Sequence, residues 1–207
     1  MIKLCVFDFD STLMDGETIT NFAKSVGVDE EVSEITKRAM AGELDFFESL
    51  TQRVGLLKGV KAEVIEEIAK NLPFIKGAKE IISYLKAKGI KVAVFSGGFH
   101  VATDYAKEIL GFDASFANYL HEKDGVLTGE MGGEMSFGFS KGKVLREVKE
   151  LMGLKTEEIM CVGDGANDVS MFRESGLKIA FCANEILKKE ATYCVEVKDL
   201  MEIAKYV

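Results

Sequence analysis

Residues 3–12 read KLCVFDFDST, an almost unbroken apolar run that ends in two acids and two hydroxyl residues. A short apolar run of this kind, bounded by turn-forming residues, is typical of a strand buried on both faces. Similar runs recur along the chain and are mostly separated by segments with helical spacing: residues 91–95, 158–162, 178–181 and 193–197. This alternation predicts an α/β fold with a Rossmann-like, doubly wound and mainly parallel sheet.

Residues 14–72 interrupt this alternation, because they contain no strand-like run and carry several amphipathic helical patterns in succession. They follow the first strand directly, and the sheet pattern resumes only after Pro73. We therefore expect a helical cap subdomain at residues 14–72 and an α/β core formed by residues 1–13 and 73–207.

A small β-hairpin is expected within the core. Residues 119–135 alternate between apolar and polar side chains, and an Asp-Gly pair stands at positions 124 and 125. Asp-Gly between two alternating runs is a strong signal for a two-residue hairpin turn.

The composition narrows the function classes. The chain has 207 residues, 47% of them hydrophobic, and a formal net charge of −8. A protein that binds the nucleic-acid backbone needs a basic face, so a nucleic-acid partner is not expected. No hydrophobic run has the length of a signal peptide or a membrane span, which predicts a cytoplasmic protein without a membrane partner.

The four cysteines each lie in a short apolar run and form no close pair: Cys5, Cys161, Cys182 and Cys194. This pattern favours four buried thiols over a redox or zinc site.

Asp8 and Asp10 stand where the first strand gives way to a loop. Residues two apart in extended chain point to the same side, so both carboxylates can face one substrate. A carboxylate attacks phosphorus only when the negative charge of the phosphate is screened, which calls for a metal ion. Taken alone, the pair is equally compatible with two acids that cap a loop.

A second acidic motif, GDGAND at residues 163–168, follows the apolar run 158–162. Parallel strands end at the same edge of a sheet, so Asp164 should lie near Asp8. Carboxylates are the oxygen ligands that Mg²⁺ prefers. By itself the motif could also be a calcium-like loop or an acidic turn, but together with Asp8 it predicts a metal site.

An anion site is expected at Ser96-Gly97-Gly98, which lies between the strand run 91–95 and a helical run from Phe99. A hydroxyl and bare backbone amides at the start of a helix bind anions, aided by the helix dipole. Lys141 opens the next helical run, where a cation opposes the dipole, so binding phosphate is one reason for its presence.

The order of these motifs resembles the phosphatase branch of the haloacid dehalogenase-like superfamily over nearly the whole chain: Asp8-x-Asp10-x-Thr12, Ser96, Lys141 and GDGxND at 163–168. The resemblance implies Mg²⁺ as cofactor, held by Asp8, the Asp10 carbonyl and Asp164, with Asp168 supporting from behind. It implies Asp8 as nucleophile, Asp10 as general acid and base, and Ser96, Gly97, Lys141 and Asn167 as phosphate or substrate contacts.

Within that branch, the motifs together with Glu17-Thr18-Ile19 and the stretch 49–54 resemble the phosphoserine phosphatase family. The resemblance implies that Glu17 and Arg53 hold the ammonium and carboxylate of O-phospho-L-serine, a pairing that suits their charges. Without it, both residues would be interpreted as solvated surface charges. Met40 and Phe46 would close over the substrate.

The sequence leaves three alternatives open. The substrate could be another small phosphomonoester, or the phosphoryl group could pass to an alcohol instead of water. A non-catalytic phosphate-binding module is the least favoured, because a Gly-x-Gly-x-x-Gly motif after the first strand is absent. The chain would act as a monomer or a homodimer.

Overall fold

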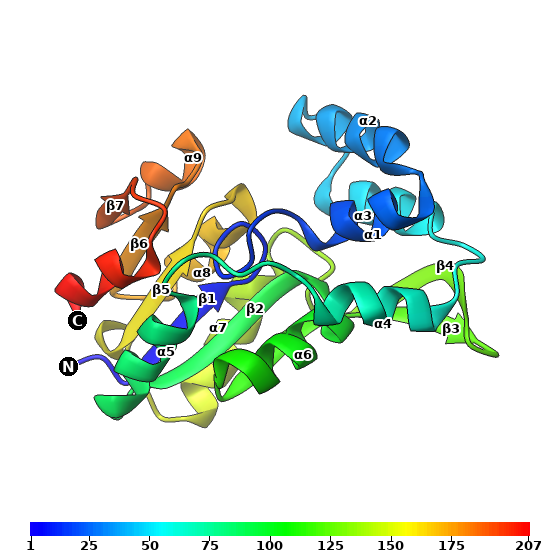
Figure 1. The fold of residues 1–207 in the computed structure, drawn as a ribbon. Coiled ribbons are helices and arrows are strands. Elements are labelled where there is room, and N and C mark those ends of the chain that lie inside the picture. The colour runs from blue at the N-terminus through cyan, green and yellow to red at the C-terminus, as the bar shows by residue number, and fades with distance from the viewer.

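The computed structural model describes residues 1–207, apart from the side chain of Met40. Within the described residues one seven-stranded sheet has the order β4-β3-β2-β1-β5-β6-β7. All neighbouring strands are parallel except β3 and β4, which are antiparallel. The expected α/β fold with a mainly parallel sheet is confirmed (Figure 1).

The strands are β1 (Leu4–Asp8), β2 (Lys91–Phe99), β3 (Ala114–Lys123), β4 (Val126–Gly133), β5 (Ile159–Gly163), β6 (Leu177–Phe181) and β7 (Tyr193–Val195). The α-helices are α1 (Thr18–Val26), α2 (Asp29–Met40), α3 (Phe46–Gly55), α4 (Ala62–Lys70), α5 (Ala78–Ala87), α6 (His100–Leu110), α7 (Ser140–Leu151), α8 (Val169–Phe172) and α9 (Glu185–Lys188). Short 3₁₀ turns are η1 (Thr156–Glu158), η2 (Ala166–Asp168) and η3 (Leu200–Tyr206).

Strand β1 is buried along its whole length because both faces of the sheet are covered. Cys5 and Phe7 point into one core cluster, which includes apolar side chains of α5, α6 and η3. Leu4 and Val6 point into the opposite cluster with α7 and α8. The two-residue period of the strand thus supplies both cores, as a doubly wound sheet requires.

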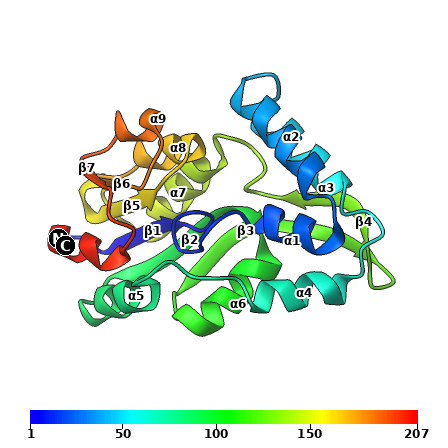
Figure 2. The ribbon, with the colours of Figure 1, turned by 45° about the horizontal axis from the view of Figure 1, so that its top comes forward.

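The helices α1 to α4 lie together between β1 and α5 in the sequence and gather beside the β3–β4 hairpin (Figure 2). Helix α3 contacts β4, and α4 contacts α6. The chain enters and leaves this group through two segments that run side by side, since Met14 forms a bridge to Phe74 and the Asp15 amide donates to the Pro73 carbonyl at 2.8 Å. The boundaries of cap and core remain a prediction, which is supported by the contact between these two segments.

The hairpin turn is formed by Asp124 and Gly125, with φ angles of 54° and 75°. Two successive residues with positive φ are the mark of a type I′ turn, and this confirms the hairpin. It does not stand apart from the core, because β3 also pairs with β2 and carries the sheet outward.

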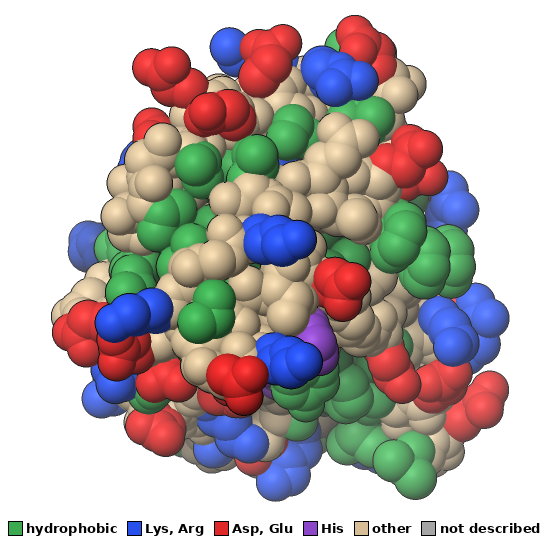
Figure 3. Space-filling model, turned by 90° about the vertical axis from the view of Figure 1, so that its right-hand side faces the viewer, with side chains coloured by type: hydrophobic (Ala, Val, Ile, Leu, Met, Phe, Trp, Pro, Cys, Tyr) green, Lys and Arg blue, Asp and Glu red, His purple; other side chains and the backbone are tan. Residues whose placement is uncertain are grey.

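Two observations bear on the expectation, drawn from the composition, that the protein has no nucleic-acid and no membrane partner. Acidic and basic side chains are interspersed over the face formed by the helical group and the hairpin (Figure 3). No helix among the described residues is long and apolar enough to cross a membrane.

The expectation of four buried thiols is wrong in part: Cys5 and Cys161 are buried, whereas Cys182 and Cys194 are exposed. Cys182 follows the last residue of β6 and has a positive φ of 46°, and Cys194 lies on β7, the edge strand of the sheet.

A stack of three phenylalanine rings joins α3 to the segment between β4 and α7. Phe47 stacks on Phe137 with 5.1 Å between ring centroids, and Phe137 stacks on Phe139 at 5.4 Å. All three rings are partly exposed. Stacked aromatic pairs contribute about 0.5–1.5 kcal/mol beyond the area they bury, so the stack holds α3 against the core.

We predict that Phe47 and Phe137 are energetically coupled. A double-mutant cycle of Phe47→Ala and Phe137→Ala, measured by chemical denaturation, should give a coupling free energy of about 0.5–1.5 kcal/mol. Additive effects of the two substitutions would contradict the contact.

Candidate active site

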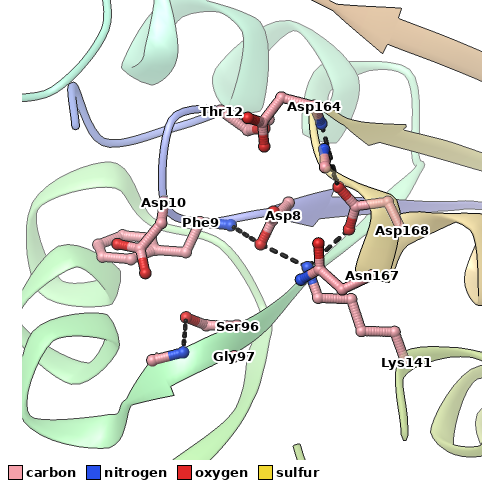
Figure 4. A network of polar contacts seen from close by, with 12 residues as sticks. Asp8, Phe9, Asp10, Thr12, Ser96, Gly97, Lys141, Asp164, Asn167 and Asp168 are labelled. Atoms are coloured by element: carbon pink, nitrogen blue, oxygen red, sulfur yellow. Dashed lines mark hydrogen bonds and ion pairs between the residues drawn. The ribbon is translucent and has the colours of Figure 1, made fainter. Parts of the chain in front are cut away.

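The acidic residues singled out in the sequence meet at the carboxyl ends of β1 and β5. Strands β1 and β5 pair in parallel, with Phe7 opposite Val162, so Asp8 and Asp164 follow at the same edge. The loop after β1 is tight: the Leu13 and Met14 amides both donate to the Phe9 carbonyl. The predicted convergence of the two motifs is what the structure has (Figure 4).

Lys141 lies between two buried carboxylates. Its Nζ is 2.5 Å from Asp8 Oδ1 and 2.6 Å from Asp168 Oδ1, and its side chain is only 3% exposed. Burial disfavours the charged amine, but Asp168 and Asp8 outweigh it and raise the pKa of Lys141. The lysine is therefore a fixed positive charge beside Asp8.

Asp168 has no free oxygen. Oδ1 contacts Lys141, and Oδ2 accepts from the backbone amides of Asp164 and Gly165 at 3.0 and 2.9 Å. It therefore shapes the loop that carries Asp164. Gly163 lies against this carboxylate so closely that a Cβ there would overlap it, which is why the motif needs a glycine.

The described residues fit a divalent cation. Carboxylate oxygens of Asp8, Asp164 and Asp168 all lie within 4.8 Å of one another. Asp168 already uses both of its oxygens within the protein, so Asp8 and Asp164 are the carboxylates that could hold the ion. Burial and the neighbouring Asp168 raise the pKa of Asp8 well above its ordinary value, while Lys141 acts in the opposite direction. Burial and Asp168 likewise raise the pKa of Asp164 to about 7. A hard cation such as Mg²⁺ prefers carboxylate ligands and would reduce the repulsion between these clustered acids.

Asp10 lies at the N-terminus of α1. Its Oδ1 accepts from the Thr18 backbone amide at 2.9 Å and from the Thr18 hydroxyl. Burial and the negative charge of Glu17 raise the pKa of Asp10 to about 7, although both Thr18 contacts lower it. A carboxyl group poised near neutrality can both give and take a proton. Sequence reasoning gave Thr18 no role, although its place at a helix start was a usable signal.

The segment Ser96-Gly97-Gly98 corrects one expectation. Strand β2 continues to Phe99 and α6 begins at His100, so these residues are the end of a strand and not the start of a helix. The helix-dipole argument for this segment is therefore wrong. Ser96 is fully buried, and its Oγ accepts from the Gly98 amide at 2.9 Å.

A cavity of about 170 Å³ opens above these groups. Its lining brings together many of the residues predicted from the sequence: Asp8, Asp10, Glu17, Phe46, Arg53, Gly97, Asp164 and Asn167. Ser96 and Lys141 lie buried beneath it. Four lining residues received no binding role in the sequence analysis, three of them apolar: Ile19, Leu50, Phe99 and Gly165.

The helical group covers this cavity. Phe46 packs over Gly97 so tightly that a Cβ on the glycine would lie 2.7 Å from the ring. Arg53 is held by its own helix, since Nε donates to the Ser49 carbonyl at 3.2 Å. Burial lowers the pKa of Arg53, and the carboxylates of Glu17 and Asp10 oppose that shift. The predicted role of Met40 falls on a side chain outside the described residues.

The sequence and the fold are similar to those of known proteins. Residues 2–176 match the family model described as haloacid dehalogenase-like hydrolase. The chain is a haloacid dehalogenase-like hydrolase. This hydrolase is 57% identical to the phosphoserine phosphatase of Campylobacter jejuni subsp. doylei over 100% of both chains. It is 50% identical to that of Methanocaldococcus jannaschii, over 99% of this chain and 97% of the relative.

Two solved structures share the fold of the hydrolase closely. One is described as a phospho-aspartyl intermediate analogue of phosphoserine phosphatase, with a TM-score of 0.94 at 50% identity. The other is a substrate-bound phosphoserine phosphatase complex, with a TM-score of 0.94 at 49% identity. Each comparison covers 100% of this chain and 99% of the other.

The clustered acids predict how the stability of the hydrolase depends on pH. The pKa values of Asp10 and Asp164 rise from 3.8 to about 7 on folding, so the folded state binds these protons more tightly than the unfolded state. In chelator, the free energy of unfolding should therefore fall as the pH rises from about 4 to about 7. Asp164→Asn should make this fall smaller and should also weaken stabilisation by added Mg²⁺.

Thermal denaturation in chelator at about pH 5 and about pH 8 measures this difference. Glu108→Gln, an exposed acid on α6, is the matched control and should follow the parent protein. An Asp164→Asn profile identical to that of the parent would rule out Asp164 as a source of the pH dependence.

Proposed function

We propose that this hydrolase converts O-phospho-L-serine to L-serine and phosphate through an aspartyl phosphate on Asp8, as the last step of serine synthesis. The observation that carries the proposal is one cavity lined both by the carboxylates of Asp8 and Asp10 and by the opposite charges of Glu17 and Arg53. The first pair suits phosphoryl chemistry, and the second pair suits an amino acid. Relatives that share 50–57% of the sequence over nearly their full length carry this activity in their names.

Asp8, the backbone carbonyl of Asp10 and Asp164 are proposed to hold Mg²⁺, with Asp168 keeping the loop of Asp164 in place. When bound, the ion would screen the charge of the phosphate. The proximity of three carboxylate oxygens within 4.8 Å supports this assignment, because the single charge of Lys141 offsets only part of their mutual repulsion.

The phosphate is proposed to be gripped by Ser96, Gly97, Lys141 and Asn167. Ser96 Oγ already accepts a hydrogen bond from the Gly98 amide, so its own proton is available for a phosphate oxygen. Lys141 keeps its charge because of Asp8 and Asp168 and can attract the phosphate toward the nucleophile. Asn167 lies beside this group and lines the cavity (Figure 4).

The reaction then needs two proton transfers, one from Asp10 and one to it. Asp8 attacks phosphorus in line, and protonated Asp10 donates its proton to the departing serine oxygen. Asp10, now ionised, takes a proton from the water that attacks the aspartyl phosphate, which releases phosphate and restores Asp8. A pKa of about 7 supports both roles, since the group must change protonation state in each cycle.

The substrate's amino-acid end is proposed to lie between Glu17 and Arg53. Glu17 would meet the ammonium group, and the guanidinium of Arg53 can hold a carboxylate with two parallel hydrogen bonds. Arg53 is partly buried, so its attraction for an anion is stronger than at an open surface.

Residues 14–72 are proposed to act as a cap that closes over the substrate and excludes water during the first step. The contact of Phe46 with Gly97 supports this role for Phe46, and Met40 keeps the same predicted role. Every proposed site residue comes from one chain, so either a monomer or a homodimer would contain complete active sites. We propose that the enzyme works in the cytoplasm.

The first experiment measures phosphate release from a panel of phosphomonoesters in Mg²⁺ and in chelator. We expect a strong preference for O-phospho-L-serine, dependence on Mg²⁺, and no turnover by Asp8→Asn. Asp10→Asn should bind substrate but slow turnover by about 10²- to 10⁴-fold. Turnover by Asp8→Asn would disprove the nucleophile, whereas unselective, metal-dependent hydrolysis would keep the chemistry and discard the substrate.

Arg53→Ala tests the substrate assignment more sharply. We expect kcat/KM for O-phospho-L-serine to fall about 10- to 100-fold, because a charged hydrogen bond contributes about 1.5–3 kcal/mol. O-phosphoethanolamine has no carboxylate, so its kcat/KM should hardly change. Gln52→Ala, an exposed neighbour on α3, is the control. An equal loss for both substrates would mean that Arg53 does not recognise the carboxylate.

A further inference from the structure

Asn118 on β3 is a buried amide whose hydrogen-bonding groups point in two directions. Its side chain is completely inaccessible to solvent. Nδ2 donates to the Gly97 carbonyl at 3.1 Å, and Oδ1 accepts from the Met135 amide at 3.1 Å and from the Ser136 hydroxyl at 2.9 Å. Turning the amide over would place acceptor against acceptor and donor against donor, so the chemistry permits only this orientation.

The bond to Gly97 fixes a peptide that lines the cavity. The Gly97 carbonyl and the Gly98 amide belong to one peptide plane. Asn118 holds the carbonyl, and Ser96 Oγ accepts from the amide at 2.9 Å. Two glycines in succession leave the backbone conformationally free, so side-chain bonds at both ends of the plane are needed to define its orientation.

The sheet itself does not hold this peptide. Strands β2 and β3 pair regularly up to Phe95 opposite Phe116, and the register shifts before Phe99 meets Asn118. The irregular stretch contains Gly97 and Gly98. The Asn118 side chain thus supplies a hydrogen bond where the regular pairing of the two strands is interrupted.

Asn118 is itself firmly anchored. Gly133 of β4 approaches so closely that a Cβ there would lie 2.7 Å from the Asn118 Cα. The Met135 amide and the Ser136 hydroxyl, both in the segment that follows β4, donate hydrogen bonds to Oδ1 and fix the amide group. A side chain fixed in this way can act as a rigid support for the peptide that it touches.

We propose that Asn118 is a positioning residue for phosphate binding, which orients the Gly97–Gly98 peptide and, through it, the Ser96 hydroxyl. This inference rests on the proposed function, because it assigns Gly97 and Ser96 to the phosphate. Asn118 touches no substrate, and its effect is confined to the phosphate end of the cavity. The amino-acid end, at Glu17 and Arg53, is supplied by other elements.

The test compares inhibition by inorganic phosphate with inhibition by L-serine in Asn118→Ala. We expect the inhibition constant for phosphate to rise about tenfold, the effect of one lost hydrogen bond, with kcat/KM falling at least as much. The inhibition constant for L-serine should stay unchanged. Ser175→Ala is the matched control: it removes one buried side-chain hydrogen bond, to the Phe172 carbonyl, away from the cavity lining, so its phosphate constant should match the parent.

Asn118→Asp is a second variant, of the same shape as the parent, in which an oxygen replaces the nitrogen that donates to Gly97. This variant is measured instead if Asn118→Ala does not fold. Folded variants that lose thermal stability but keep the parent constant for phosphate would overturn the positioning role. Equal weakening of phosphate and L-serine would overturn it as well. A parent protein that does not bind phosphate in Mg²⁺, measured by calorimetry, would overturn the proposed function and this inference together.

Discussion

The buried contact of Lys141 with Asp8 and Asp168 is the interaction on which the rest of the site depends. Two strand ends, those of β1 and β5, bring three acids to one edge of the sheet, and their repulsion would open the loops if no cation lay between them. Lys141 reaches this point because α7 begins directly beneath it, with Ser140 and Lys141 both buried. Removing one partner from a buried ion group commonly costs about 3–5 kcal/mol, so chemistry and stability are tied together here.

Burial, and to a lesser degree mutual repulsion, destabilises the ionised acids even with Lys141 in place. The pKa values of Asp8, Asp10 and Asp164 all lie above their ordinary values, chiefly because burial disfavours the charged form. Because the ionised form of these acids is destabilised, binding of a divalent ion or a proton is favourable at this site.

The helical group and the core are joined through aromatic contacts in the cavity and at the surface. Phe46 covers Gly97 from inside, while Phe47 stacks on Phe137 at the surface. These neighbouring residues of α3 therefore link the cavity lining to the segment that leads into α7. The same segment anchors Asn118, so cap contact and phosphate-side geometry share one support.

The sequence by itself determined the sheet, the hairpin turn and the convergence of Asp8, Asp10 and Asp164, because these follow from local patterns and from the rule that parallel strands end at one edge. It could not determine where β2 ends, because strand pairing beyond Phe95 is set by β3 and not by local propensity. It placed all four thiols in the core, since an apolar run does not reveal that Cys194 lies on an edge strand. The role of Asn118 arises only from contacts, because Asn118 is 21 residues from Gly97 along the chain. Only packing decides such partners, because a hydrogen bond between distant segments leaves no periodic trace in the sequence.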